Sequence, residues 1–377
     1  MNLIEIRRAL HQHPELGFEE HWTSQFLAKI LRDLGLDVTE HIGRTGLVAV
    51  IKGQHSELPA IGYRADMDAL PIKELTDVPF ASNNGNMHAC GHDSHMTVAL
   101  GVAECLANRQ SRPNRDIVFV FQPNEEGAPG ELPSGAELMV REGVIENYRI
   151  DEMIALHSDP TLDTGIMGIC RGTIWAASGR VRVTVSGKAG HAAYPYKGRD
   201  ALWAASEMIC SMYASLARMR PASPEVVSIC KLQAGTAFNV VADNAQFEGI
   251  VRAPSRQDLD DIADVLESVC AGIAQSCGVT VKFERFYGAN AVKNDDRLVD
   301  IAQQTWINAG VGRIIPMNMA SEDFSYFADR IPCFYAMMGI KPADRDIPPS
   351  HSDHFWLDEA ALEPAVRNMV MLIEVLE

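Results

Sequence analysis

The stretch Asn86–His95, which reads Asn-Met-His-Ala-Cys-Gly-His-Asp-Ser-His, constrains this chain more than any other. It places three histidines, one cysteine and one aspartate within ten residues. Because only Gly91 separates Cys90 from His92, a thiolate and an imidazole can converge on one point, which makes half of a tight metal site. The following segment, Ser94–Leu106, has a helical pattern, so the cluster would lie at a helix N-terminus, where the helix dipole favours a thiolate. A histidine-rich loop without a metal is the alternative interpretation.

Length and composition narrow the class of protein. A chain of 377 residues suits two domains, and 47% hydrophobic with 22% charged residues argues against wholesale disorder. The net charge of −17 argues against nucleic acid or an anionic membrane as a partner. No run approaches the ~20 apolar residues of a membrane span, and the N-terminus resembles an amphipathic helix more than a signal peptide. The eight cysteines are scattered, so we expect no disulfide framework and a cytoplasmic location.

The first ~170 residues alternate between strand-like and helix-like segments, which predicts an α/β fold with a mixed, mostly parallel sheet flanked by helices. Trp22–Leu34 has helical spacing and ends at Gly35. The expected strands are Gly46–Lys52, Pro59–Tyr63, Asp116–Phe121 and Met153–Leu156. Ligands bind at the carboxyl edge of such sheets. Four polar residues are expected just past the strands at this edge: Asp66, Glu125, Glu126 and His157.

The pattern changes near Trp175 to the order β-α-β-β-α-β, the split-βαβ or ferredoxin-like arrangement. The expected elements are a strand at 180–186, a helix at 200–218, strands at 226–232 and 246–252, a helix at 255–276 and a strand at 279–286. Helices at 294–309 and 359–376 then return to the first domain. We therefore predict one domain from residues 1–174 and 290–377, with an inserted domain at 175–289 and hinges near 171–178 and 287–294.

Glu125 and Glu126 follow the most hydrophobic strand-like segment, between Pro123 and Gly127. Adjacent carboxylates point in opposite directions along an extended segment, so both can serve one site only at a strand end or turn. One could then bind a metal while the other handles a proton; a solvated pair is the alternative.

Three further histidines are weak signals individually, but with Cys90 they supply the ligand types of a two-metal site: His157, His351 and His354.

Seven motifs occur in a characteristic order, and together they span nearly the whole chain. They are Leu10-His-Gln-His-Pro-Glu-Leu-Gly-Phe-Glu-Glu, Arg64-Ala-Asp-Met-Asp-Ala-Leu-Pro-Ile, Met87-His-Ala-Cys-Gly-His-Asp-Ser-His, Gln122-Pro-Asn-Glu-Glu-Gly, Gly187-Lys-Ala-Gly-His-Ala-Ala-Tyr-Pro, Gly235-Thr-Ala-Phe-Asn-Val-Val-Ala-Asp and Ser321-Glu-Asp-Phe-Ser. This set resembles the amidohydrolase branch of the aminoacylase/carboxypeptidase metallopeptidase family. That branch includes N-acyl-amino-acid amidohydrolases, hippurate hydrolases and indoleacetyl-amino-acid hydrolases.

The resemblance implies two divalent metal ions per subunit, Zn²⁺ or Mn²⁺. Cys90 would bridge them, His92 and His157 would complete the ligands of one metal, and Glu126 and His351 those of the other.

The resemblance also implies the remaining roles. Glu125 would be the general base and acid. In the inserted domain, His191 and Asn239 would polarise the scissile carbonyl, and Arg252 would anchor the substrate carboxylate. The inserted domain would act as a lid and form a homodimer, in which the lid histidine can act in the partner's site.

The expected reaction is hydrolysis of the amide bond of N-acetyl or aromatic N-acyl amino acids by a metal-activated water, which releases a carboxylic acid and a free amino acid. A dipeptidase or carboxypeptidase is the first alternative. Those branches usually carry His-x-Asp where this chain has Arg64-Ala-Asp66, and an aspartate where it has Cys90. A non-enzymatic metal-binding protein is the second alternative, and Glu125 argues against it, because binding a metal does not need an adjacent second carboxylate.

Overall fold

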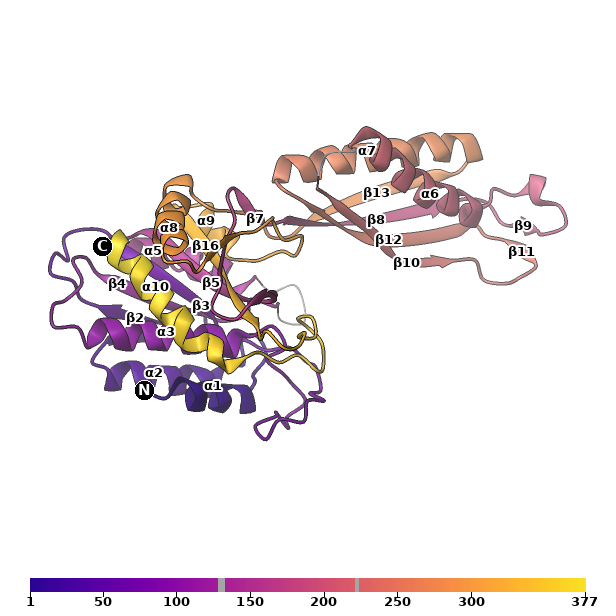
Figure 1. The fold of residues 1–377 in the computed structure, drawn as a ribbon. Coiled ribbons are helices and arrows are strands. Elements are labelled where there is room, and N and C mark those ends of the chain that lie inside the picture. The colour runs from indigo at the N-terminus through magenta and orange to yellow at the C-terminus, as the bar shows by residue number, and fades with distance from the viewer. Residues whose placement is uncertain (128–132, 221–223) are drawn as a thin grey trace. The chain divides into compact units, whose positions relative to one another are not determined.

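The computed structural model describes residues 1–127, 133–220 and 224–377 (Figure 1). The chain forms two compact units. The first comprises residues 1–174, 293–316 and 323–377, and the second comprises 175–292 with 317–322. The chain passes between the units four times, and two of these passages lie within the short paired strands β7 (Thr173–Trp175) and β14 (Val292–Lys293).

The first unit is built on an eight-stranded sheet of mixed direction. Its strands, in spatial order, are β1 (Asp37–Ile42), β2 (Gly46–Ile51), β4 (Ile117–Gln122), β3 (Ala60–Asp66), β5 (Ile150–Asp163), β16 (Cys333–Lys341), β6 (Met167–Ile169) and β15 (Gly312–Ile314). Parallel pairing joins β3 to β4 and β5, β5 to β16, and β6 to β15. Antiparallel pairing joins β1 to β2, β2 to β4, and β6 to β16. This confirms the predicted mixed, mostly parallel sheet.

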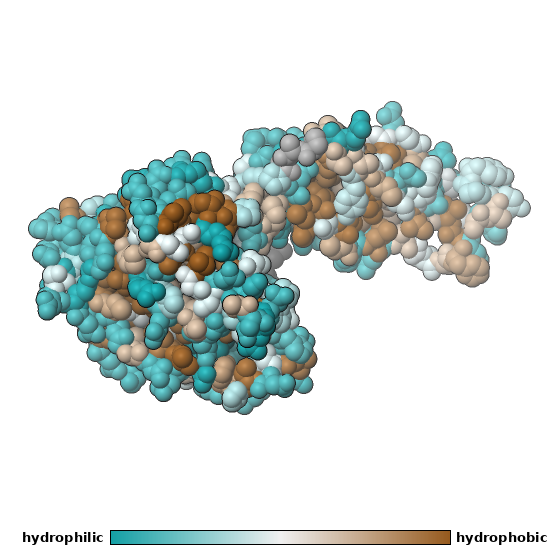
Figure 2. All heavy atoms as spheres, viewed as in Figure 1, coloured by the Kyte–Doolittle hydropathy of each residue, from teal (hydrophilic) through white to brown (hydrophobic). Residues whose placement is uncertain are grey.

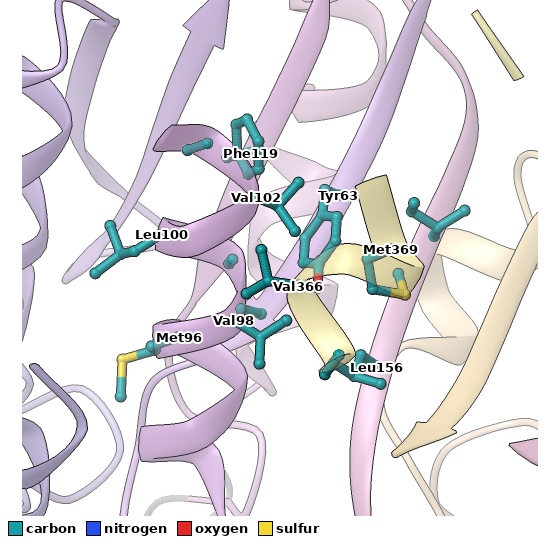
Figure 3. Packing of buried hydrophobic residues seen from close by; sticks show 14 of the residues in the cluster. Tyr63, Met96, Val98, Leu100, Val102, Phe119, Leu156, Val366 and Met369 are labelled. Carbon is teal, nitrogen blue, oxygen red and sulfur yellow. The ribbon is translucent and has the colours of Figure 1, made fainter. Parts of the chain in front are cut away.

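Helices surround this sheet. They are α1 (Leu3–Gln12), α2 (His21–Asp33), α3 (His92–Ala107), α4 (Gly135–Arg141), α5 (Val144–Asn147), α8 (Asp296–Asn308), α9 (Ser325–Ala328) and α10 (Leu362–Leu376), with a 3₁₀ turn at Glu359–Ala361. Thirteen of the sixteen residues of α3 are buried, because it lies between the sheet and α1 and α10. Figure 3 shows this core, where Tyr63 and Leu156 of the sheet lie near Val98 of α3 and Val366 of α10.

The second unit has the expected β-α-β-β-α-β order. Its elements are β8 (Ala177–Ser186), β9 (Gly190–His191), a 3₁₀ turn (Pro195–Lys197), α6 (Ala201–Met219), β10 (Val226–Ala234), β11 (Val240–Val241), β12 (Asn244–Ala253), α7 (Arg256–Cys277) and β13 (Thr280–Tyr287). The main sheet is antiparallel with the order β10-β12-β8-β13. Apolar residues of its strands pack against α6 and α7 in a separate core, so this unit has its own interior.

Several strands differ from the sequence-based expectation, and two of them, β5 and β16, affect the placement of His157. The segment expected to end before His157 continues to Asp163, so the placement of His157 beyond a strand end is wrong. The reason is pairing with β16, in which Met337 lies opposite His157 and Met338 opposite Ser158. The strand β16 itself was not expected, although nearly all of it is buried. Among the described residues, no helix is both long and apolar enough to cross a membrane.

We predict that Leu100→Ala destabilises the protein by about 2–5 kcal/mol, because Leu100 is fully buried and its truncation leaves a cavity. Leu58, in the same unit, is 40% exposed and is the matched control, for which Leu58→Ala should change stability by no more than about 0.5 kcal/mol. Urea unfolding followed by circular dichroism measures both. Equal shifts in the two variants would show that the core around Leu100 collapses to fill the gap.

Candidate metal centre

The first unit brings all five predicted metal ligands together. Cys90 lies in the loop before α3, His92 is the first residue of α3, and Glu126 lies in the turn after β4. His157 points from within β5, and His351 comes from the loop after β16, whose backbone donates a hydrogen bond from the His351 amide to the carbonyl of Ala89 at 2.8 Å. Parallel pairing of β3, β4 and β5 places their carboxyl ends at one edge of the sheet, as expected for a ligand site.

The donor atoms form two groups that share one residue. In each group the atoms lie within 4.8 Å of one another, and the groups are Cys90 with His92 and His157, and Cys90 with Glu126 and His351. The Cys90 Sγ lies 3.4 Å from His157 Nε2, and His351 Nε2 lies 3.2 Å from a Glu126 carboxylate oxygen. Glu125 belongs to neither of these two groups, but it forms a third possible donor group with His92 and Glu126, and its Oε2 lies 3.9 Å from His92 Nε2.

The hydrogen bonds of two histidines fix which ring nitrogen faces the site. His92 Nδ1 lies 2.9 Å from the backbone carbonyl of Asp68, and His157 Nδ1 lies 2.8 Å from that of Ser158. Because a carbonyl only accepts, each Nδ1 donates, and Nε2 is the nitrogen left to bind a metal. Within the described residues, the buried His92 Nε2 has no hydrogen-bond partner. Metal-binding histidines typically show this pattern, with the second nitrogen donating to a carbonyl.

Electrostatics at the site also favour a cation. Hydrogen bonds to Cys90 and Glu126 raise the pKa of His351 to about 10, against the effect of burial. Burial and the Glu126 carboxylate raise the pKa of the Cys90 thiol. Burial and the neighbouring His95 lower the pKa of His157 to about 3, which keeps that imidazole neutral, as a ligand must be. The donor set therefore fits a divalent cation, whose charge would favour the Cys90 thiolate.

Two other histidines are used differently. His95 Nδ1 bonds to Asp66 at 2.6 Å, and His95 Nε2 accepts the Ser158 amide at 2.8 Å, so both ring nitrogens are committed. Exposed His354 pairs with Asp353 at 2.7 Å and belongs to neither donor group that contains Cys90. His95 thus holds Asp66 and Ser158 in place next to the donor groups and is not itself one of the predicted metal ligands.

A buried polar frame extends from His95. The Arg64 guanidinium donates to Asp66 at 2.7 Å and to the amide oxygen of Gln122 at 2.8 Å. Ser158 completes the frame, because its hydroxyl donates to the carbonyl of Cys90 at 3.0 Å. Sequence reasoning gave Asp66 a place at this edge and missed Ser158, for which the only signal was its position after His157.

The three site residues expected in the inserted domain all lie in the second unit, but not together. Val240, next to Asn239, pairs with His191, and the amide of Ala192 donates to the Asn239 carbonyl at 3.1 Å. Arg252 lies near the opposite end of β12, where it faces Ser178. Asn244 and Arg252 are eight residues apart along β12, which at about 3.3 Å per residue is roughly 26 Å. One short substrate therefore cannot contact both ends of this sheet in a single chain.

His191 has a defined tautomer. Its Nδ1 accepts the amide of Ala193 at 3.1 Å, so Nε2 carries the proton in the neutral ring, and the side chain is exposed. Within the described residues, the half-buried Arg252 guanidinium donates to the Val251 carbonyl at 3.1 Å and pairs with no carboxylate. His191 can thus donate a hydrogen bond to a carbonyl oxygen, and Arg252 can donate hydrogen bonds to a carboxylate.

We predict that Gly91→Ala destabilises the metal-free protein more than Gly35→Ala does. Both glycines have positive φ, +90° and +84°, so each substitution should cost about 1–2 kcal/mol in backbone strain. A Cβ at Gly91 would also lie 2.4 Å from the Ser158 hydroxyl, whereas a Cβ at Gly35 meets nothing within 4 Å. Thermal unfolding measures the difference. Equal losses would mean that Ser158 moves freely and does not hold the Cys90 loop.

Comparison with known proteins agrees with the motifs. Residues 62–375 match the model of the peptidase family M20/M25/M40. An N-acetyldiaminopimelate deacetylase of Lactococcus lactis subsp. cremoris is 35% identical over 97% of this chain and 96% of its own length. The hippurate hydrolase of Campylobacter jejuni is 35% identical over 89% and 87%. The structure of Bacillus subtilis YXEP, described as a dinuclear metal-binding peptidase, shares 32% identity, with a TM-score of 0.86 and coverage of 99% and 97%. The chain therefore belongs to the peptidase family M20/M25/M40.

Proposed function

We propose that this protein is a metal-dependent amidohydrolase that cleaves the amide bond of N-acyl amino acids and releases a carboxylic acid and a free amino acid. The observation that carries the proposal is Cys90, which is common to two three-residue donor groups, with Glu125 beside them and in neither. A protein that only stored a metal would not need this extra carboxylate. Relatives named for N-acetyldiaminopimelate, N-acetylcysteine and hippurate support the substrate class.

In this proposal the centre would hold two divalent ions, Zn²⁺ or Mn²⁺, with Cys90 among the ligands of both. His92 and His157 would complete the ligands of one ion, and Glu126 and His351 would complete those of the other. Thiolate and imidazole suit Zn²⁺, whereas carboxylate ligands also suit Mn²⁺. When bound, such ions lower the pKa of a coordinated water from 15.7 toward about 7 and polarise a carbonyl.

Glu125 then handles the proton. Its carboxylate accepts a proton from the attacking water and delivers it to the nitrogen of the leaving amino acid. The role of Glu126 is different, because it would bind the metal. Its backbone is held in place, since the Glu126 amide donates a hydrogen bond to the Asp68 carboxylate at 2.9 Å. Both glutamates therefore serve one site from a turn, where an extended strand would point them apart.

We propose that the second unit is a lid that supplies the contacts to the substrate. His191, through its Nε2 proton, and Asn239 would bind the scissile carbonyl oxygen, and this contact strengthens as negative charge develops. Arg252 would bind the substrate carboxylate through two parallel hydrogen bonds. Because His191 and Asn239 lie beyond one end of the four-stranded sheet and Arg252 lies near the other end, a single substrate would have to use Arg252 of one chain and the partner's His191 and Asn239.

This arrangement requires a homodimer, and the surface of the second unit supports one. Strand β10 is an outer strand of the four-stranded sheet, and among the described residues one of its edges pairs with no other strand. Figure 2 shows hydrophobic residues on the visible face of this unit. Exposed apolar side chains of the unit include Leu202, Trp203, Tyr213 and Leu232. Light scattering should give twice the chain mass of 41.4 kDa.

We also propose a cytoplasmic location, since every cysteine in the described chain is a free thiol.

A substrate panel tests the function. The purified protein, loaded with Mn²⁺ or Zn²⁺, should release amino acid from N-acetyl and N-benzoyl amino acids, and Glu125→Gln is the inactive control for contaminating enzymes. Dipeptides and peptides with a free C-terminus form the comparison set. Faster cleavage of these peptides would support the alternative dipeptidase or carboxypeptidase function, and no cleavage of any amide would leave only a metal-binding role.

The adjacent glutamates should give opposite phenotypes. Glu125→Gln should retain two metals per chain and lose kcat by a factor on the order of 10²–10⁴, the contribution of general acid–base catalysis. Glu126→Gln should lose metal, because an amide is a poorer ligand than a carboxylate. Elemental analysis and kinetics on the same samples measure both. Reversed phenotypes would show that the two roles are exchanged along this turn.

Arg252→Ala should raise KM for N-acyl amino acids by roughly 10–100-fold, which corresponds to the ~1.5–3 kcal/mol of a hydrogen-bonded charge. For the corresponding carboxamides, which lack the charge, the change should be small. Arg182→Ala is the matched control on the neighbouring strand, because that arginine already pairs with Glu248 at 3.3 Å. Equal effects on acids and amides would contradict the role of Arg252 as a carboxylate anchor.

A further inference from the structure

Glu20 is a buried carboxylate with no place in either metal group. It occupies the N-cap position of α2 but makes no side-chain hydrogen bond to that helix, and it is fully buried. Its side chain instead reaches across to the turn after β4, where one oxygen accepts the amide of Asn124 at 2.8 Å. Its other oxygen accepts the hydroxyl of Thr45 at 2.5 Å. The carboxylate therefore connects the N-terminal segment to the turn that carries Glu125 and Glu126.

The residue that Glu20 holds has an unusual backbone. Asn124 has φ of +49°, a left-handed conformation that asparagine tolerates better than most non-glycine residues but that is still uncommon. Its surroundings leave little room to relax, because a Cβ at Gly17 would lie 1.9 Å from the Asn124 side-chain oxygen. The Asn124 carbonyl accepts the amide of Gly135 at 3.1 Å. A strained residue of this kind persists only where its neighbours over-determine it.

The turn is thus held on both sides of Glu125. Glu20 accepts the amide of Asn124, and Asp68 accepts the amide of Glu126. Burial and the nearby Asp68 carboxylate raise the pKa of Glu20 to about 7, so its position is unfavourable for the charged form. A carboxylate in such a place needs compensating hydrogen bonds, and the Asn124 amide is one of them.

We propose that Glu20 is a positioning residue that fixes the backbone on the N-terminal side of Glu125, so that Glu125 faces the reacting water while Glu126 faces the metal. The proposal rests on the proposed function for the role of Glu125. Glu20 acts through the Asn124 amide and touches neither substrate nor metal. Loss of this bond would leave Glu126 held by Asp68 and by the metal, and would chiefly misalign Glu125.

The test compares Glu20→Ala, which removes the acceptor, with Glu20→Gln, which keeps an oxygen acceptor of similar shape. Glu20→Ala should lower kcat by about 10–100-fold, the effect of a misplaced catalytic group, with KM and metal content nearly unchanged. Glu20→Gln should restore kcat to within about threefold, since its amide oxygen can accept the same N–H. Glu152→Gln is the control, because Glu152 is also buried but pairs with Arg115 and Arg297.

Hydrogen exchange in the metal-free protein gives a readout that does not depend on activity. In Glu20→Ala, the peptide that contains residues 121–127 should exchange at least about tenfold faster, while peptides of α2 and β2 stay as in the wild type. Glu20→Gln and Glu152→Gln should match the wild type. If the wild type cleaved no N-acyl amino acid, the proposed function would fail, but the exchange data would still decide the role of Glu20.

Two results would overturn the inference. One is wild-type exchange and kcat in Glu20→Ala, which would mean that water or a shifted side chain replaces the acceptor. The other is faster exchange throughout the first unit without rescue by Glu20→Gln, which would mean that Glu20 stabilises the fold in general.

Discussion

Parallel pairing of β3 with β4 and β5 is the constraint on which the metal centre depends. The register places Asp66 opposite Gln122, so the ends of β3 and β4 coincide. The turn with Glu125 and Glu126 therefore starts beside the residue that holds His95. On the other flank, β5 runs past this edge, because β16 continues to pair with it as far as Asp163. His157 consequently points into the site from a rigid strand, which suits a ligand better than a mobile loop does.

A second constraint is the cost of the buried charges around the centre. Arg64 is almost completely buried with Asp66 and Asp323, and a buried ion pair often adds little net stability. The effect of the Arg64 ion pairs on the geometry of the site is clearer than their effect on stability. It fixes Asp66, which fixes His95, which accepts the Ser158 amide, and Ser158 ties the Cys90 loop to β5. Because His95 Nε2 accepts the Ser158 amide, the ring proton is on Nδ1, which donates to Asp66. The frame thus defines the positions of ligands from two separate segments.

The sequence predicted the elements of the site better than their supports. The two-residue spacing of Cys90 and His92 and the turn chemistry around Glu125 depend on local geometry, which a sequence displays directly. Ordered motifs supplied His157 and His351, whose separate signals were weak. Glu20 and Ser158 could not be found in this way, because their partners lie 104 and 63–68 residues away and their contacts exist only after the sheet forms. The end of β5 was misjudged for the same reason, since β16 determines it from far along the chain.

The second unit adds a geometric argument about assembly. Its sheet is long relative to an N-acyl amino acid, and the residues suited to bind the two polar ends of such a substrate lie at opposite ends of that sheet. Movement of the unit as a rigid body cannot shorten the distance between Arg252 and His191, because both belong to it. A catalytic role for both residues therefore requires two chains. Dimerisation would then be necessary for catalysis. The β10 edge, which is exposed in the single chain, would be covered by the second chain in the active dimer.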